Sequence, residues 1–121
     1  MKKLIGLLVF ISGLMAQQYY CASVAIVDAI TFKTLKKFTK TEMKIAVIGK
    51  DDGVIYDAEE VYQKYNENDG IEFYKSKKGN IIVAEELSSG NMVMMSKPEQ
   101  ENMFVKYYCM PKEKIEKKTG K

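Results

Sequence analysis

The sequence predicts an α+β fold that is mostly antiparallel β: a meander of short strands with one or two short helices, closed by a terminal disulfide. Short apolar runs separated by turn residues recur along the chain and indicate the strands. Two stretches space their apolar residues as a helix does and indicate the helices. The only two cysteines lie near the two ends of this pattern and indicate the bond that closes it.

The first predicted strand is followed by the first predicted helix. Residues 19–30 are apolar at both odd and even positions, which favours a buried strand. Residues 31–40 carry apolar side chains at every third position, namely Phe32, Leu35 and Phe38. With lysines between them, this spacing predicts a short amphipathic helix that Thr31 caps.

The second predicted helix begins after Asp57. This residue has the chemistry of an N-cap, and Glu60 stands three positions later, as in a capping box. The apolar side of the helix would consist of Val61, Tyr62 and Tyr65. Residues 66–70 (NENDG) are rich in turn formers and would end the helix.

Six further strands are predicted, at residues 44–49, 54–56, 71–75, 81–87, 92–95 and 103–109. The sequence Asp-Asp-Gly at positions 51–53 is a strong turn signal between the first two. The last four are separated by turns at 77–80 and 88–91 and by a loop at 98–102. Short strands at this spacing are typical of an antiparallel meander.

The start of the chain predicts export. Lys2 and Lys3 precede an apolar run at residues 4–16, which is shorter than the roughly 20 residues that a transmembrane helix needs. A signal peptide at 1–16 cleaved after Ala16 fits this pattern. We therefore expect a single domain at 17–110, a charged flexible tail at 111–121, and a periplasmic or secreted bacterial protein. An uncleaved anchor is the alternative, because apolar character resumes at Tyr19.

Cys21 and Cys109 predict an intramolecular disulfide. An even cysteine count in an exported chain indicates a bridge. Bridged Cα atoms lie within about 7 Å. The segments around Val24 and Phe104 should therefore be neighbours, either in one ladder or across two layers.

The composition argues against several classes of function. The chain has no His, which removes the commonest general base and metal ligand, and we expect no enzyme and no cofactor. It also has no Arg, and without Lys2 and Lys3 its formal charge falls from +3 to +1. Near-neutral charge and the lack of the guanidinium fork argue against nucleic-acid binding.

Two groups of residues are candidate sites. On a strand, Met92 and Met94 share a face, and such paired thioethers could bind Cu(I), although gap-filling in a core is the simpler interpretation. Four lysines could contact anionic lipid or a partner, with a solvated helix face as the alternative: Lys33, Lys36, Lys37 and Lys40.

A small exported domain without catalytic or cofactor motifs is expected to bind something. The main hypothesis is a binding or interaction protein of the bacterial envelope or secreted fraction whose partner is another protein, with protein inhibition as one form of that activity. Two alternatives stay open. One is an envelope-associated accessory protein of a surface or secretion system with peripheral membrane contact. The other is a periplasmic Cu(I)-handling protein that uses its Met residues.

Overall fold

The computed structural model describes residues 17–98 and 100–114. These residues form nine strands: β1 (Gln17–Asp28), β2 (Thr34–Lys37), β3 (Ile45–Asp51), β4 (Val54–Tyr56), β5 (Val61–Asn68), β6 (Ile71–Ser76), β7 (Ile81–Glu86), β8 (Met92–Lys97) and β9 (Met103–Pro111). Every pairing between neighbouring strands is antiparallel. The predicted mostly antiparallel β-fold is therefore confirmed.

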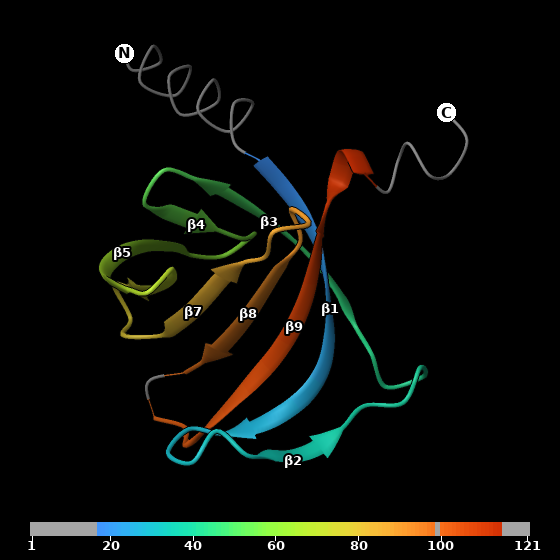
Figure 1. The fold of residues 1–121 in the computed structure, drawn as a ribbon. Coiled ribbons are helices and arrows are strands. Elements are labelled where there is room, and N and C mark those ends of the chain that lie inside the picture. The colour runs from blue at the N-terminus through green and yellow to red at the C-terminus, as the bar shows by residue number, and fades with distance from the viewer. Residues whose placement is uncertain (1–16, 99, 115–121) are drawn as a thin grey trace.

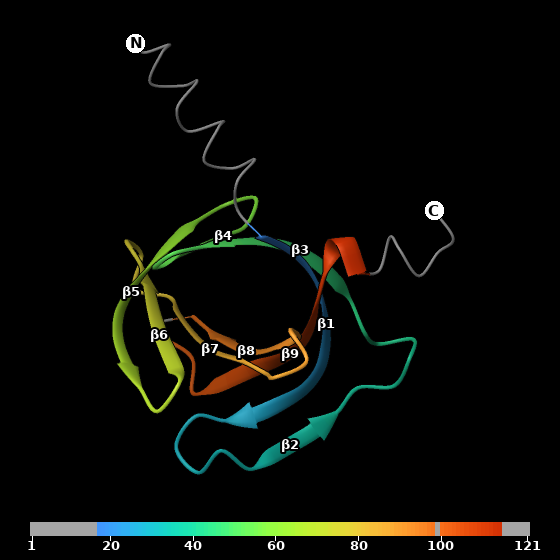
Figure 2. The same ribbon diagram turned by 45° about the horizontal axis from the view of Figure 1, so that its top comes forward.

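Eight of the strands close into a barrel. The order β1-β3-β4-β5-β6-β7-β8-β9 is completed by pairing of β1 with β9 (Figure 1). The barrel has no free sheet edge along this seam, which is how closure protects β-proteins from edge-to-edge association. β2 lies outside the ring and extends the sheet from the second half of β1 (Figure 2).

The interior of the barrel is filled by side chains. In β1, every odd-numbered residue from Tyr19 to Val27 is buried, and the even-numbered residues point outward. The main core cluster consists of Tyr19, Cys21, Ile48, Ile55, Tyr62, Tyr74, Ile82, Ala84, Met92, Met94 and Cys109. An eight-stranded barrel is just wide enough for its side chains to fill it, and three large tyrosines do so here.

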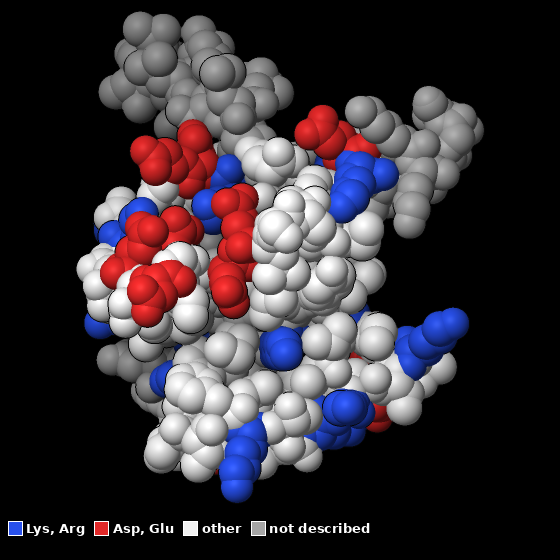
Figure 3. All heavy atoms as spheres, in the orientation of Figure 1, with Lys and Arg blue, Asp and Glu red and all other residues white. Residues whose placement is uncertain are grey.

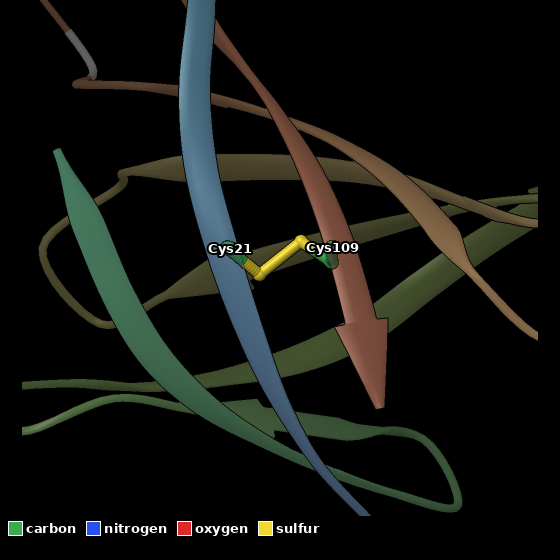
Figure 4. The surroundings of a disulfide bond; sticks show 2 residues. All are labelled: Cys21 and Cys109. Carbon is green, nitrogen blue, oxygen red and sulfur yellow. A yellow bond between two sulfur atoms is a disulfide. The ribbon is translucent and has the colours of Figure 1, made fainter. Parts of the chain in front are cut away.

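The predicted disulfide is confirmed, and it lies inside the barrel (Figure 4). Cys21 and Cys109 are directly opposite each other in the β1–β9 ladder, with 4.0 Å between their Cα atoms. Val27 pairs with Phe104 further along the same ladder. The two terminal segments are thus neighbours in one sheet, which selects between the two arrangements that the sequence leaves open.

The helix predicted at residues 31–40 is wrong. Phe32 has a φ of 60°, which no right-handed helix accommodates. β2 follows at Thr34, and the Phe38 N–H donates to the Val24 carbonyl at 2.9 Å. Pairing with β1 therefore overrides the three-residue spacing of the apolar side chains.

The helix predicted after Asp57 is also wrong, although its cap is present. The Asp57 carboxylate accepts the N–H groups of Glu59 and Glu60 at 2.8 Å. The turn ends there, and β5 begins at Val61. The buried side chain of Tyr62 alternates with exposed neighbours, so the local period is two.

The ends of the predicted domain are only partly described. The expected signal peptide at 1–16 and most of the expected tail lie outside the described residues. At the C-terminal side, β9 continues to Pro111, and residues 112–114 form one helical turn. Within the described ranges, this turn is the only α-helical segment, so the fold contains almost no helix.

Candidate interaction surfaces

The methionines predicted as soft-metal candidates lie in the barrel core. Met92 is fully buried and pairs with Cys109 in the ladder, while Met94 is 3% exposed and pairs with Tyr107. Met110 lies next to the inward-facing Cys109 and so points outward. Because Cys109 is oxidised and Met92 and Met94 are packed among apolar groups, their arrangement is that of core side chains.

A metal site built from carboxylate, imidazole or thiolate ligands is also not formed in the part of the chain that the structure describes. No group of three or more Asp, Glu, Cys or His side chains in residues 17–98 and 100–114 lies close enough together to hold an ion. The candidate sites that remain are surfaces.

The predicted lysine cluster projects from the barrel on the segment that contains β2. We call residues 29–44 the β2 arm. Lys33, Lys36, Lys37 and Lys40 are all exposed on it, and Lys44 stands at its end. Lys36 and Lys37 are adjacent on a strand, so they point to opposite sides of the arm rather than to one helix face.

The opposite end of the barrel, where β1 begins, is acidic (Figure 3). Its acidic residues come from the ends of β3, β5, β6 and β7 and from the turns beside them: Asp51, Asp52, Glu67, Asp69, Glu72 and Glu86. A polar pocket of about 280 Å³, here called the mouth, opens among them. It is lined by Gln17, Tyr19, Lys50, Asp51, Asp52 and Glu86.

Hydrogen bonds and ion pairs connect the walls of the mouth. The Tyr19 hydroxyl reaches from β1 to β7 and donates to the Glu86 carboxylate at 3.1 Å. Deeper in the barrel, the Tyr74 hydroxyl donates to Glu72 at 2.6 Å. The same carboxylate pairs with two lysines, Lys50 at 3.4 Å and Lys64 at 3.6 Å.

The pKa shifts in the mouth keep these groups in their ordinary charge states. Burial, and then the negative charge of Glu86, raises the pKa of Tyr19 to about 12. Burial and the hydrogen bond to Glu72 likewise raise the pKa of Tyr74. Burial opposes ionisation of Glu72, but the Tyr74 hydroxyl and the two lysines outweigh it and lower the pKa of this carboxyl. At neutral pH the carboxylate is ionised and the phenols are protonated, which suits a network that ties the mouth together.

A groove of about 720 Å³ runs along the outer side of β5 and β6. Val61 and Tyr65 line it and are 56% and 55% exposed, because the alternating strand turns Tyr62 into the core and its neighbours outward. The Lys75 ammonium lies 5.5 Å from the centroid of the Tyr65 ring, a cation–π contact. The groove thus presents apolar, aromatic and cationic groups together.

The remaining charged lining lies at one end of the groove, where β5 begins beside the end of β6. Lys77 and Lys78 from the β6–β7 turn and Glu59 from the β4–β5 turn contribute to it. Glu60 accepts a hydrogen bond from the Asn80 side chain at 2.8 Å through one carboxylate oxygen. Its other oxygen is buried without a partner among the described residues, which leaves an unsatisfied acceptor in the wall of the groove.

The sequence does not reveal the groove or the mouth. Its spacing places Val61, Tyr62 and Tyr65 together on a helix, and only their alternation in β5 separates the two exposed side chains from the buried one. The mouth depends on residues from β1, β3 and β7, which become neighbours only on closure of the barrel. Residues 61–65 (VYQKY) do not alternate apolar and polar side chains, so the sequence carries no period-two signal for the groove.

The disulfide indicates an oxidising, non-cytoplasmic compartment. In the described residues, no helix has the length and apolar character needed to span a membrane. Comparison with known protein families, curated proteins and solved structures gives no significant match.

Proposed function

We propose that the protein is a small exported interaction protein, periplasmic or secreted, that binds another protein through the groove of β5 and β6. The groove carries this proposal, because it combines concave shape with half-exposed Val61 and Tyr65. Tyrosine is enriched in protein interfaces because it offers apolar area and a hydroxyl at low entropic cost. The export expected from residues 1–16 and the oxidised cysteines support the extracytoplasmic location.

The architecture supports binding rather than chemistry. The barrel interior is filled by large side chains, and the polar groups of the mouth are bonded to one another. The groove lies on the outer surface of two paired strands, so the backbone that carries its side chains is fixed by the β5–β6 ladder. Preorganisation of this kind favours affinity, since little conformational freedom is lost on binding.

The experiment is capture of the partner from the native envelope and secreted fractions, followed by titration of the purified pair. Tyr65→Ala should weaken binding by at least about tenfold, as truncation of an interface aromatic commonly does. The control, Tyr108→Ala, removes another half-exposed tyrosine from the outer side of β9, and binding should stay unchanged. Equal affinity of the wild type and Tyr65→Ala would contradict the proposal.

The same titration separates two forms of the function. If the captured partner is an enzyme, its activity is measured with and without the saturating protein. A fall in activity that Tyr65→Ala relieves identifies an inhibitor. Unchanged activity with intact binding identifies an adaptor.

A further inference from the structure

Exposed apolar side chains concentrate around the β2 arm. Ten large hydrophobic residues are exposed in the described part of the chain, and six of them lie between positions 30 and 47: Ile30, Phe32, Leu35, Met43, Ile45 and Val47. Single exposed hydrophobic residues are ordinary, but a concentration of them marks an interaction site. Ile30 is the extreme case, with 82% of its surface exposed.

The arm is also strongly basic. Residues 29–44 contain five lysines and one acidic residue, which gives this segment a formal charge of +4. The acidic residue, Glu42, pairs with Lys36 at 3.2 Å. The cationic side chains lie at the end of the molecule opposite the acidic mouth (Figure 3). The arm is therefore the part of the surface that an anionic partner would attract.

The turn that leads into β2 is closed by hydrogen bonds and has apolar residues at its tip. The Asp28 carboxylate accepts the N–H groups of Ile30 and Thr31 at 2.8 Å, and the Phe32 N–H donates to the Asp28 carbonyl at 2.9 Å. Phe32 has a φ of 60°, where Gly or Asn would be unstrained. The chain nevertheless has an aromatic side chain at the tip of this turn.

The Phe32 ring is both anchored and accessible. It stacks on Phe104 with 6.2 Å between the ring centroids, yet 60% of the residue is exposed. Leu35, in the strand that follows, is 53% exposed. Lysines stand between and beyond these apolar residues, on both sides of the strand. The apolar tip is thus surrounded by positive charge.

We propose that the β2 arm docks the protein on an anionic lipid bilayer. Ile30, Phe32 and Leu35 enter the boundary between headgroups and acyl chains, and Lys33, Lys36, Lys37 and Lys40 face the lipid phosphates. Lysines beside an apolar tip are complementary to a bilayer, which has anionic headgroups at its surface and acyl chains beneath them. Because Lys36 and Lys37 point to opposite sides of the strand, an arm that inserts with its tip first places positive charge against the headgroups on both sides.

The proposal is tested with the purified protein and phosphatidylcholine vesicles that contain or lack phosphatidylglycerol. Cosedimentation should require phosphatidylglycerol and should weaken as salt rises. Replacing Lys33, Lys36, Lys37 and Lys40 by Gln should lower the vesicle partition coefficient by about fivefold for each lysine. Ile30→Ser should lower it by about tenfold with the melting temperature unchanged, because Ile30 makes few contacts in the fold.

Two matched variants complete the design. Lys77→Gln with Lys78→Gln removes two exposed lysines from the β6–β7 turn, and Val61→Ser removes another exposed aliphatic side chain. Both variants should bind vesicles nearly as the wild type does. Because Val61 lines the groove, Val61→Ser also distinguishes vesicle binding by the arm from partner binding by the groove. Absence of vesicle binding, equal binding to neutral vesicles, or an Ile30→Ser variant that binds normally would overturn the proposal. The proposal would also be overturned if the Lys77 and Lys78 variant lost as much vesicle binding as the variant of the four arm lysines.

Discussion

At the residue scale, the mouth shows how buried tyrosines and carboxylates satisfy each other. The Tyr19 residue is only 2% exposed, and its hydroxyl donates to Glu86. Tyr74 is fully buried and donates to Glu72. A phenol is a suitable donor here because it stays protonated far above neutral pH. The charged lysines then neutralise the deeper carboxylate, so that a polar network can occupy one end of an apolar barrel.

Tyr19 makes the stability of the fold sensitive to alkaline pH. Its pKa is raised from 10.0 to about 12 by burial and by Glu86, so the unfolded state loses this proton first. The stabilising contribution is fully present below pH 10 and is lost as pH rises through 12. Tyr19→Phe should therefore flatten the fall in melting temperature between these pH values, and should cost about 1 kcal/mol at neutral pH through the lost hydrogen bond.

Thermal unfolding of both proteins across this pH range checks the prediction. The control is Tyr20→Phe, which changes the neighbouring tyrosine that faces outward in β1. It removes the same hydroxyl group from the outer side of the strand, so the difference between the two variants reports the buried hydroxyl of Tyr19. A Tyr19→Phe variant with an unaltered alkaline limb would show that the Tyr19 proton is not linked to unfolding.

At the element scale, the sequence predicts strands correctly where apolar residues and turn chemistry agree. Residues 44–49, 54–56 and 92–95 form β3, β4 and β8 almost as predicted, and Gly53 adopts a φ of 73° in the expected turn. The two helix predictions fail because local spacing is ambiguous. Asp57 caps a turn whether or not a helix follows, and pairing of the next segment with β4 decides the outcome. Tertiary pairing of this kind is not visible in a short window of sequence.

The candidate surfaces are predictable to a smaller extent than the strands. The charge of the segment identifies the exposed lysines of the arm. The spacing of the apolar residues, however, predicts a helix where the structure has β2. Helical spacing puts Val61 and Tyr65 on the apolar side of a helix, which would bury them. With the helical period of 3.6 the three residues 61, 62 and 65 share one face, whereas with the strand period of two Val61 and Tyr65 face away from the buried Tyr62.

The β3–β4 hairpin offers a prediction at this scale. Gly49 is buried beneath the Tyr56 ring across the ladder, and a Cβ atom at position 49 would lie 3.0 Å from the ring. Gly49→Val should therefore destabilise the protein by about 1–2 kcal/mol through overpacking. In a Tyr56→Ala background the same substitution should be neutral or stabilising, because valine favours strands.

Chemical denaturation of the four proteins in this double-mutant cycle gives the coupling energy between the two positions. Gly49→Ala, which adds only the Cβ atom, provides a milder version of the same substitution. An equal cost of Gly49→Val in both backgrounds would mean that the backbone, and not the tyrosine ring, requires glycine here.

At the scale of the whole molecule, the two ends of the barrel have different surfaces. The acidic mouth surrounds the beginning of β1, and the Lys112 ammonium joins the end of the described chain to Gln18 at 3.3 Å. The basic arm extends from the far end of β1. Docking of the arm on a bilayer would therefore direct the mouth away from the lipid. The groove, on the outer side of β5 and β6, would stay accessible to a protein partner.

Closure of the barrel depends on the pairing of β1 with β9, which is the pairing that the disulfide crosses. Cys21 and Cys109 are separated by 88 positions in the sequence. The sequence could predict this contact because cysteine chemistry requires proximity, whereas the alternating patterns of the other strands leave their register open. Strand pairs this distant in sequence are costly to form, since the chain loses loop entropy before the contacts compensate it.

The disulfide should therefore contribute strongly to stability. A bridge that closes such a long loop is expected to stabilise the fold by about 2–4 kcal/mol, mainly by restricting the unfolded chain. Reduction should lower the melting temperature by at least about 8 °C in a domain of this size. The barrel should still form, because the β1–β9 ladder pairs residues on both sides of the cysteines.

The measurement compares the melting temperatures of the oxidised and the reduced wild-type protein. Reduction changes the side-chain volumes very little, so the difference in melting temperature reports the effect of the cross-link itself. Cys21→Ala with Cys109→Ala should melt at one temperature with or without reductant. A wild-type protein whose melting temperature is unaffected by complete reduction would show that closure of the barrel is secured by strand pairing and core packing alone.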